Sequence, residues 1–293
     1  MIVYDQPLYR PPSEARSLIF QVTLGCSHNR CAFCVSYQNK RFRIRKLDEV
    51  FAEIDEAAQV YPDTRRVFLA DGDAMAVKPE RMVRILERLY ARFGRLQRVT
   101  AYAGPGNLLP REVERLAAVR RAGLSMLYFG LESGDDEVLE RVDKGYTQDE
   151  MVAACDKAHQ AGFDLSVTVI LGLAGPKGSA RHARASAQAL DRIRPRFAAA
   201  LTLMLEPRRP SFAECYGDPD WRPLDASESL VECRALLAHM QADGITFRSN
   251  HASNYVALKG DLQRDKQRLL DTIDQALSDP ASPLRRPDWM RAL

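Results

Sequence analysis

Three cysteines lie close together near the start of the chain, in the segment LGCSHNRCAFC. Cys26, Cys31 and Cys34 have the spacing C-x4-C-x2-C, and thiolates are soft ligands that suit zinc, copper(I) and iron–sulfur clusters. A structural zinc site needs a fourth ligand, and the neighbouring His28 would be strained if it joined the three thiolates. Three thiolates on one loop instead suit an iron–sulfur cubane in which one iron stays open to a substrate or cofactor.

The remaining cysteines show no such grouping. Cys155 falls in the apolar spacing of a helix, where we expect core packing. Cys215 and Cys233 are far apart and form no C-x2-C pattern. We therefore expect no second metal cluster.

The composition is that of a globular enzyme, with 293 residues of which 46% are apolar and 28% charged. The 42 Lys and Arg residues nearly balance the 39 Asp and Glu residues, so electrostatic binding to nucleic acid is not expected. No apolar run reaches the roughly 18 residues of a membrane span. The N-terminus has no cationic start followed by an apolar core, so it does not resemble a secretory signal. We expect a cytoplasmic protein.

Short apolar runs alternate with amphipathic stretches over most of the chain, which predicts alternating strands and helices. The strands are expected at residues 18–24, 66–70, 98–102, 125–131, 164–171 and 198–205. Strand–helix units of about 30 residues imply right-handed crossovers and a parallel sheet, either open and doubly wound or closed into a barrel. In both cases the chemistry takes place at the carboxyl ends of the strands. The three cysteines directly follow the first strand.

The pattern changes after Leu205. Residues 206–223 are rich in proline and predict an irregular loop. A helix at 229–241, a short strand near 245–248 and a helix at 262–277 follow, and the tail from 281 to 293 is expected to be loosely attached. Earlier in the chain, Pro79 and Pro110 are expected to open helices.

Phe33 stands immediately before the third cysteine. The loop resembles the cluster-binding loop of the radical S-adenosylmethionine (SAM) superfamily, whose usual spacing is C-x3-C-x2-C with an aromatic residue in that position. This chain has one additional residue between Cys26 and Cys31. The resemblance implies that Cys26, Cys31 and Cys34 hold a [4Fe–4S] cluster and that Phe33 lies beside SAM.

Two later segments resemble the places where that superfamily contacts SAM. VFLADGDAM is similar to the turn whose carbonyls and acidic side chain receive the SAM amino group, which implies roles for Asp71, Gly72 and Asp73. YFGLESGDD is similar to the segment in which a glutamate contacts the ribose hydroxyls, which implies roles for Glu132 and Ser133. Taken alone, DGD is a common turn and Glu132 could be a surface carboxylate or a helix cap. Their positions after predicted strands favour the SAM roles.

Four further positions are expected near SAM. LSVTVILGLAGP resembles the strand that packs against the adenine, with Ile170 and Gly172 as contacts. Lys144 is expected to reach the SAM carboxylate, the alternative being a solvated lysine at a helix end. Tyr102, at the end of the third strand, is expected to point toward the same edge of the sheet, with simple rim packing as the alternative.

The superfamily resemblance also implies a fold, because it covers about residues 17–206. We expect an α/β protein with a partial (β/α)6 barrel of the TIM type and parallel strands. The expected divisions are an N-terminal extension at 1–16, the barrel core at 17–206 and a short α-rich C-terminal extension or substrate cap at 207–293.

The implied activity is reductive cleavage of SAM at the cluster, which yields a 5′-deoxyadenosyl radical that abstracts hydrogen from a substrate. Because the potential of such a cluster is low, a flavodoxin or ferredoxin electron donor is expected. The absence of a second cysteine cluster argues against sulfur-inserting relatives, and the short C-terminal part argues against an RNA-binding domain. A small-molecule substrate is therefore expected.

Several polar residues outside these motifs have two interpretations. Arg248 and His251, in the segment RSNHASNY, could contact substrate or belong to a structural turn network. The basic run RFRIRK could form a solvated face, or a docking patch for an acidic redox partner or a phosphate. Its cations are Arg41, Arg43, Arg45 and Lys46. His182 is expected either near the carboxyl ends of the strands or on the exposed surface of a helix.

Two alternatives to the radical enzyme remain. The cysteines could hold zinc or a cluster in a module without turnover, or the chain could bind SAM as a scaffold. Glu132 and the DGD turn favour the enzyme over the metal module, because a metal module has no need of them.

Overall fold

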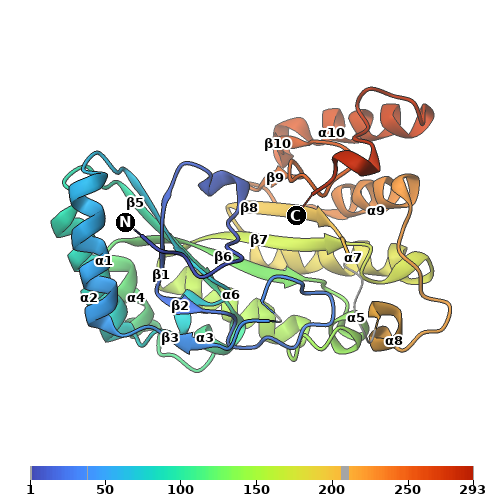
Figure 1. Cartoon of the computed structure of the whole chain (residues 1–293). Coiled ribbons are helices and arrows are strands. Elements are labelled where there is room, and N and C mark those ends of the chain that lie inside the picture. The colour runs from blue at the N-terminus through green and yellow to red at the C-terminus, as the bar shows by residue number, and fades with distance from the viewer. Residues whose placement is uncertain (1, 38, 206–210, 293) are drawn as a thin grey trace. The chain divides into compact units, whose positions relative to one another are not determined.

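The computed structural model describes residues 2–37, 39–205 and 211–292 of the chain (Figure 1). The chain forms two compact units. Unit 1 consists of Met1–Arg30, Ser36–Phe129 and Ala153–Leu165, and unit 2 of Cys31–Val35, Gly130–Val152 and Ser166–Leu293.

Unit 1 is built on parallel strands. β1 (Leu18–Gln21), β4 (Arg66–Ala70), β5 (Arg98–Ala103) and the first part of β6 (Leu124–Glu132) pair in that order. β4 is apolar on both faces, and Phe68 and Leu69, which point to opposite faces, are both fully buried. Such apolar runs are typical of parallel strands that are covered on both sides.

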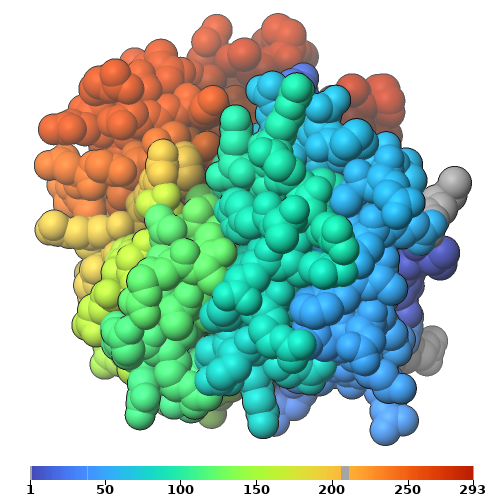
Figure 2. Space-filling view, turned by 90° about the vertical axis from the view of Figure 1, so that its left-hand side faces the viewer, coloured from blue at the N-terminus to red at the C-terminus, as the bar shows by residue number. Residues whose placement is uncertain are grey.

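Helices α1 (Leu47–Val60), α2 (Pro79–Arg92) and α4 (Val113–Arg121) pack side by side in unit 1 (Figure 1), and their surfaces run as adjoining bands from blue to blue-green in Figure 2. α2 buries Met82, Leu86 and Leu89, spaced three and four residues apart on one stripe. The short turns η2 (Ala74–Ala76) and α3 (Pro105–Leu108) follow β4 and β5, and most of α6 (Gln148–Gln160) also belongs to this unit.

The N-terminal segment is tied to the amino ends of the unit 1 strands. The short turn η1 (Pro12–Glu14) ends in Glu14, whose side chain is fully buried. Its carboxylate pairs with Arg66 and Arg98, the first residues of β4 and β5, and accepts a hydrogen bond of 2.6 Å from the Tyr128 hydroxyl. Because a buried carboxylate without partners is strongly unfavourable, these contacts hold the segment in place.

Unit 2 continues the alternation of strands and helices. β7 (Asp164–Leu171), β8 (Phe197–Thr202) and β9 (Thr246–Arg248) are parallel neighbours, and β10 (Lys259–Asp261) pairs with β9 in the antiparallel sense. α7 (Gly175–Ile193), α9 (Ala226–His239) and α10 (Leu262–Ser278) pack side by side (Figure 1). The smaller elements are α5 (Asp136–Arg141), α8 (Phe212–Tyr216) and the turn η3 (Asp288–Met290).

The α/β class with mostly parallel strands is confirmed. All six predicted strands form, two of them with the expected bounds, 66–70 and 164–171. The strand expected near 245–248 is β9, which adds a further parallel strand beside β8. The division expected at residues 16 and 206 stays a prediction. Among the helices formed by the described residues, none combines the length and the apolar character that a membrane span requires.

Two expectations about helix and strand limits are wrong. The first strand does not run to residue 24, because β2 (Thr23–Leu24) leaves the β1 direction and pairs in the antiparallel sense with β3 (Arg43–Ile44). Pro110 opens no helix, because α3 begins at Pro105 and α4 at Val113.

Two expectations about the C-terminal part are also wrong. The proline-rich stretch is not wholly irregular, since Ser211 and Glu214 form a capping box that opens α8; residues 206–210 of this stretch lie outside the described residues. The tail is not loosely attached, because the Arg286 guanidinium donates to the carbonyls of His251, Ala252 and Asn254.

Candidate functional site

In unit 1, the DGD turn after β4 lies against the segment that carries Cys26. The Gly72 amide donates a hydrogen bond of 3.0 Å to the Gly25 carbonyl. A Cβ atom at Gly72 would lie 2.6 Å from the Cys26 Cβ atom and 3.0 Å from the Tyr37 ring. Only glycine allows this close approach. The contact therefore brings two of the predicted motifs together.

Both carboxylate oxygens of Asp71 accept hydrogen bonds within unit 1. Its Oδ1 atom accepts a hydrogen bond of 3.0 Å from the Gln21 amide, and its Oδ2 atom accepts one of 2.8 Å from the Gly25 N–H. The Lys40 ammonium lies 3.5 Å from Oδ2. Burial raises the pKa of Asp71, while these three partners oppose the rise. Asp71 thus anchors the backbone just before Cys26, and its predicted contact with SAM stays a prediction.

Asp73 differs, because one of its oxygen atoms has no hydrogen-bond partner among the described residues. The Ser27 hydroxyl donates to Oδ2 at 2.7 Å, and the Asn107 amide donates to the same atom. Oδ1 is buried and accepts no hydrogen bond within the part of the chain that the structure describes. Burial raises the pKa of Asp73, although the bonds from Ser27 and Asn107 oppose the rise. Buried carboxylate oxygens normally have donors, so this atom is suited to a bound cation or N–H group.

Tyr102 lies near the carboxyl end of β5 among other aromatic side chains of unit 1. Its ring is in edge-to-face contact with Phe68, with ring centroids 5.0 Å apart, and with Tyr128 at 6.1 Å. The side chain is only partly buried. This geometry agrees with rim packing and leaves the predicted cofactor contact untested.

In unit 2, Glu132 ends β6 and forms an ion pair with Lys144. The Lys144 Nζ atom lies 3.0 Å from Glu132 Oε1, and the two side chains are 12% and 14% exposed. Glu132 has a φ of +63°, in the left-handed region that non-glycine residues rarely adopt. The structure therefore places Lys144 beside the predicted ribose ligand. Its predicted contact with the SAM carboxylate is not tested.

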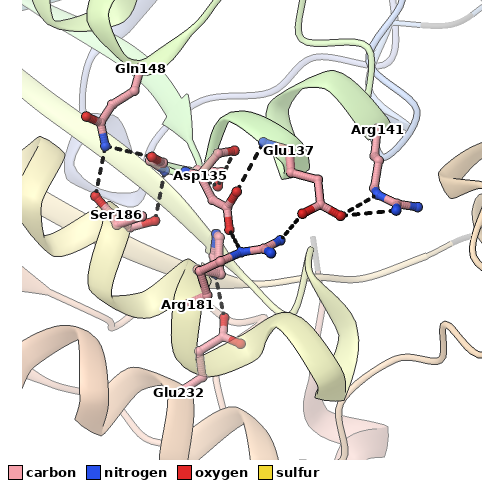
Figure 3. Close-up of polar contacts among 11 residues, drawn as sticks. Asp135, Glu137, Arg141, Gln148, Arg181, Ser186 and Glu232 are labelled. Atoms are coloured by element: carbon pink, nitrogen blue, oxygen red, sulfur yellow. Dashed lines mark hydrogen bonds and ion pairs between the residues drawn. The ribbon is translucent and has the colours of Figure 1, made fainter.

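Ser133 is fully buried at the start of the turn that leads into α5. Its hydroxyl oxygen accepts a hydrogen bond of 2.9 Å from the Asp135 N–H. Asp135 in turn caps α5 by accepting from the Glu137 N–H. The next N–H, that of Gly134, donates to the hydroxyl of Ser186 in α7, which Figure 3 shows beside Gln148. Ser133 therefore shapes the chain directly after Glu132.

The predicted adenine contact at the end of β7 is held by α7 and α9. Gly172 has a φ of +91° and donates its N–H to Glu232 Oε1 at 2.7 Å. The same oxygen lies 3.0 Å from His182 Nδ1, and Ser179 donates to the other oxygen. His182 is fully buried, so the expectation of an exposed helix surface is wrong. Its Nε2 atom has no hydrogen-bond partner among the described residues.

Cys31 and Cys34 belong to a tight turn of unit 2. The Cys34 N–H donates to the Cys31 carbonyl at 3.0 Å, and the Ala32 N–H donates to the Val142 carbonyl at 2.8 Å. Phe33 is partly buried and packs against an apolar cluster that includes Leu173. All three predicted ligands, Cys26 included, are partly exposed. The predicted binding of a metal cluster by these cysteines stays a prediction.

The other cysteines differ in burial or position. Cys155 and Cys233 are buried, and burial raises the pKa of both thiols, to about 12 for Cys233. Metal ligands must be thiolates, so these two thiols are poor ligands. Cys215 is exposed in α8.

Arg248 and His251 lie in a well-bonded part of unit 2. The Arg248 guanidinium stacks over the Phe197 ring, 3.9 Å from its centroid. The His251 Nδ1 atom is within 2.9 Å of the Ser253 hydroxyl. Burial, with the positive charge of Arg286, lowers the pKa of His251, so its imidazole is neutral at pH 7. These contacts resemble the turn network considered above, and the predicted substrate roles stay predictions.

Sequence reasoning missed several residues that hold the site. Ser27 and Asn107 bind Asp73, Lys40 pairs with Asp71, and Glu232 binds Gly172. Asn107 follows the end of β5, so its position after a strand was a usable signal. Glu232 lies inside a helix, 60 residues from Gly172, and no spacing pattern connects them.

Comparison with known proteins identifies a family and a fold. A family model described as the radical SAM superfamily matches residues 20–181. The heme chaperone HemW of Bacillus subtilis (strain 168) is 20% identical over 157 residues, which cover 51% of this chain and 41% of that protein. The chain thus spans less than half the length of this curated relative.

Two solved structures show the same fold at low sequence identity. Methylornithine synthase is similar with a TM-score of 0.54 and 17% identity, over 77% of this chain and 63% of that one. Coproporphyrinogen III oxidase from Escherichia coli, described as a radical SAM enzyme, is similar with a TM-score of 0.57 and 16% identity, over 76% of this chain and 51% of that one. The expected resemblance to partial TIM barrels is confirmed.

Proposed function

Because the chain belongs to the radical SAM superfamily, we propose that it cleaves SAM reductively at a [4Fe–4S] cluster and directs the resulting radical to a small-molecule substrate. Members of this superfamily are enzymes that bind such a cluster together with SAM. When bound, the reduced cluster supplies one electron that splits a carbon–sulfur bond of SAM, which yields methionine and a 5′-deoxyadenosyl radical. The chain's own residues bind and orient the reactants and keep water away.

In this proposal Cys26, Cys31 and Cys34 bind the cluster. Their thiols are partly exposed, unlike those of Cys155 and Cys233, and thiolates are the ligands that iron–sulfur clusters use. The contact between Gly72 and Cys26 holds the first cysteine beside the acidic turn. The hydrogen bond from Ala32 to Val142 holds the turn that carries the other two.

The free oxygen of Asp73 is the observation that carries the proposal. Asp73 Oδ1 is buried without a donor among the described residues, and Asp73 Oδ2 is bound to Ser27, the neighbour of Cys26. The ammonium group of SAM is a cation with N–H donors, and it would supply the missing bond. A structural turn gives no reason to leave a buried carboxylate oxygen unpaired.

Residues of unit 2 would hold the remainder of SAM. We propose that Glu132 accepts hydrogen bonds from the ribose hydroxyls. The ion pair with Lys144 would hold the Glu132 carboxylate in place. Ile170, Gly172 and Phe33 would contact the adenine, and the bond from Gly172 to Glu232 fixes the strand end for that contact. Arg248 and His251 remain candidates for substrate contact, with a neutral His251 as a hydrogen-bonding group.

The decisive experiment is anaerobic. The protein is reconstituted with iron and sulfide, reduced with dithionite and incubated with SAM, and 5′-deoxyadenosine is measured by chromatography. We expect 5′-deoxyadenosine from the wild type and none from the Cys34→Ala variant, which should also lose the brown colour of the cluster. Cys215→Ala is the matched control, because Cys215 lies outside the proposed ligand set, and it should behave as the wild type.

Other outcomes would contradict parts of the proposal. Stoichiometric zinc in place of the cluster would support the metal-binding module considered from the sequence. A stable cluster and SAM binding without 5′-deoxyadenosine, tested also with a reduced flavodoxin or ferredoxin as donor, would support the scaffold.

A further inference from the structure

Three aromatic side chains of the C-terminal part form a compact group in unit 2. Phe212 and Tyr216 lie in α8, and Trp221 follows it. The Phe212 and Trp221 ring centroids are 4.6 Å apart at an interplanar angle of 62°, and Tyr216 lies 5.7 Å and 5.9 Å from them. All three are buried. We call Phe212, Tyr216 and Trp221 the aromatic clamp.

The aromatic clamp packs on the turn that carries two of the proposed cluster ligands. It shares one apolar cluster with Ala32 and Phe33, the two residues between Cys31 and Cys34. Val142 belongs to the same cluster and accepts the hydrogen bond from the Ala32 N–H. A backbone hydrogen bond to Val142 and the packing of these side chains therefore both contribute to holding the cysteine turn.

Trp221 also holds the end of β7. Its indole N–H donates to the Leu173 carbonyl at 3.0 Å. A Cβ atom at Gly175, where φ is +64°, would lie 2.8 Å from the Trp221 ring, so a glycine is needed for the ring to lie there. Leu173 directly follows Gly172, a proposed adenine contact. One side chain thus connects the cysteine turn to the strand end that would receive SAM.

A series of ion pairs anchors the aromatic clamp to α5 and α7. The Arg141 guanidinium lies over the Tyr216 ring, 5.2 Å from its centroid, and donates to the Tyr216 carbonyl at 3.1 Å. Figure 3 shows how Arg141 continues through Glu137 to Arg181, which in turn pairs with Asp135. These pairs are partly exposed, so each is weak alone, but together they hold Arg141, which contacts both the ring and the carbonyl of Tyr216.

We propose that the aromatic clamp is a positioning device for the cofactor site, so that part of the C-terminal extension sets the geometry of Cys31 and Cys34 and of the strand end at Leu173. The effect on the cofactor site rests on the proposed function, whereas the packing of the aromatic clamp does not. Phe212, Tyr216 and Trp221 are positioning residues, since they act through the cysteine turn and β7. Removing the Trp221 ring leaves a cavity that the neighbouring turn can fill only by moving.

The first test uses the protein without its cluster. Hydrogen–deuterium exchange, resolved by peptide, reports on the amides of Ala32 and Cys34, which are both hydrogen-bonded. In Trp221→Ala we expect exchange of this segment to be about tenfold faster or more. The other tryptophan, Trp289, is 82% exposed, so Trp289→Ala is the matched control and should leave the exchange unchanged.

The second test uses the reconstituted protein and a conservative variant that keeps the packing. Trp221→Phe retains an aromatic ring but cannot donate to the Leu173 carbonyl. We expect it to keep the cluster as long as the wild type under a chelator, while its affinity for SAM, followed by the change that SAM causes in the cluster's electron paramagnetic resonance spectrum, falls several-fold. Trp221→Ala should lose iron faster as well.

The outcomes separate the two proposals. The positioning role would be overturned if folded Trp221→Ala showed unchanged hydrogen–deuterium exchange in the cysteine turn. It would also be overturned if Trp221→Phe bound SAM with unchanged affinity. If Trp221→Ala does not fold, the SAM affinity of Trp221→Phe alone tests the positioning role. If the wild type binds no cluster, the proposed function fails, while the exchange measurement still decides whether the aromatic clamp orders the cysteine turn.

Discussion

At the scale of single residues, the two carboxylates of the DGD turn have different environments although they are two positions apart. Asp71 is bonded at both oxygens, to Gln21 and to the Gly25 N–H. Asp73 keeps one buried oxygen without a partner among the described residues. The first carboxylate therefore stabilises the folded chain, and the second is available to a ligand.

Matched substitutions should separate these two roles. Asp73→Asn removes the charge that would bind the SAM ammonium group, so the dissociation constant for SAM should rise by about 10- to 100-fold, the effect of a charged hydrogen bond, with the cluster retained. Asp71→Asn should instead lower the free energy of unfolding by about 1–3 kcal/mol, because the new NH2 group leaves one of the two buried donors without an acceptor. Equilibrium SAM binding and chemical denaturation measure the two effects. Equal effects of both variants on SAM binding would contradict the distinction.

The raised pKa of Asp73 also predicts a pH dependence. Burial raises this pKa above the unfolded-state value of about 3.9, so the folded chain holds the proton more tightly. The stability that this gives is fully present below about pH 3.9 and is lost as the pH rises through the folded-state pKa. Denaturation of the apoprotein at a series of pH values should show this loss in the wild type and less of it in Asp73→Asn. SAM affinity should rise over the same range, as Asp73 ionises.

At the scale of elements, two strands end in residues with unusual backbone conformations. Asp71 after β4 has a φ of +67°, and Glu132 at the end of β6 has a φ of +63°. Each such residue in the left-handed region costs about 1–2 kcal/mol. Residues of this kind persist where other contacts fix them, and they occur often at functional sites. Both are residues that the sequence motifs had indicated.

Replacing Glu132 by glycine tests this interpretation. Glycine adopts a positive φ without strain, and the relief offsets the loss of the ion pair with Lys144. We expect the free energy of unfolding of Glu132→Gly to stay within about 1 kcal/mol of the wild type. SAM affinity should fall about tenfold or more, as in Glu132→Gln. A large loss of stability with unchanged SAM affinity would make Glu132 a structural residue only.

The elements were largely predictable from the sequence, because apolar runs and helical spacing report burial directly. β4 and β7 were found to the residue. α8 was missed, since the surrounding prolines concealed its Ser211–Glu214 capping box. β2 was assigned to the first strand because nothing local indicates that it pairs with Arg43 and Ile44. The end of the first strand was therefore set by the pairing of β2 with a distant segment.

The candidate site was predictable only where a motif carried it. Cys26, Asp73 and Glu132 came from motifs, but the contacts of Asp73 with Asn107 and of Leu173 with Trp221 join residues 34 and 48 positions apart. No spacing pattern encodes such pairs. The polar network around Glu232 was not predicted for the same reason. The sequence does not distinguish a buried glutamate of an amphipathic helix from an exposed one.

At the scale of the whole molecule, the net charge of +3 is small, but exposed cations lie near the first cysteine. β3 pairs Arg43 with Leu24, two residues before Cys26, and both Arg41 and Arg43 are exposed. Arg45 of the same run differs, because it is paired with Glu53 at 2.7 Å. The two exposed arginines, Arg41 and Arg43, are therefore our candidate docking patch for an acidic electron donor.

Charge reversal tests the docking patch. In the double variant Arg41→Glu, Arg43→Glu, reduction by flavodoxin at low salt should slow by about tenfold, and the difference should shrink as salt is added. Reduction by dithionite should be unchanged, because it needs no protein contact. The double variant Arg95→Glu, Arg264→Glu changes the net charge by the same amount at two other exposed arginines, so it is the matched control. An equal slowing by the control variant would point to net charge rather than to a patch.

The buried carboxylate of Glu14 has a consequence for how the protein is made. During synthesis Glu14 emerges 84 residues before Arg98 and 114 residues before Tyr128. At about 5–20 residues per second the segment waits roughly 6–23 seconds for its last partner. Until Tyr128 is made, the carboxylate lacks one of the partners that it has in the folded unit. The segment that carries Glu14 can therefore reach its final set of contacts only after β6 has been made.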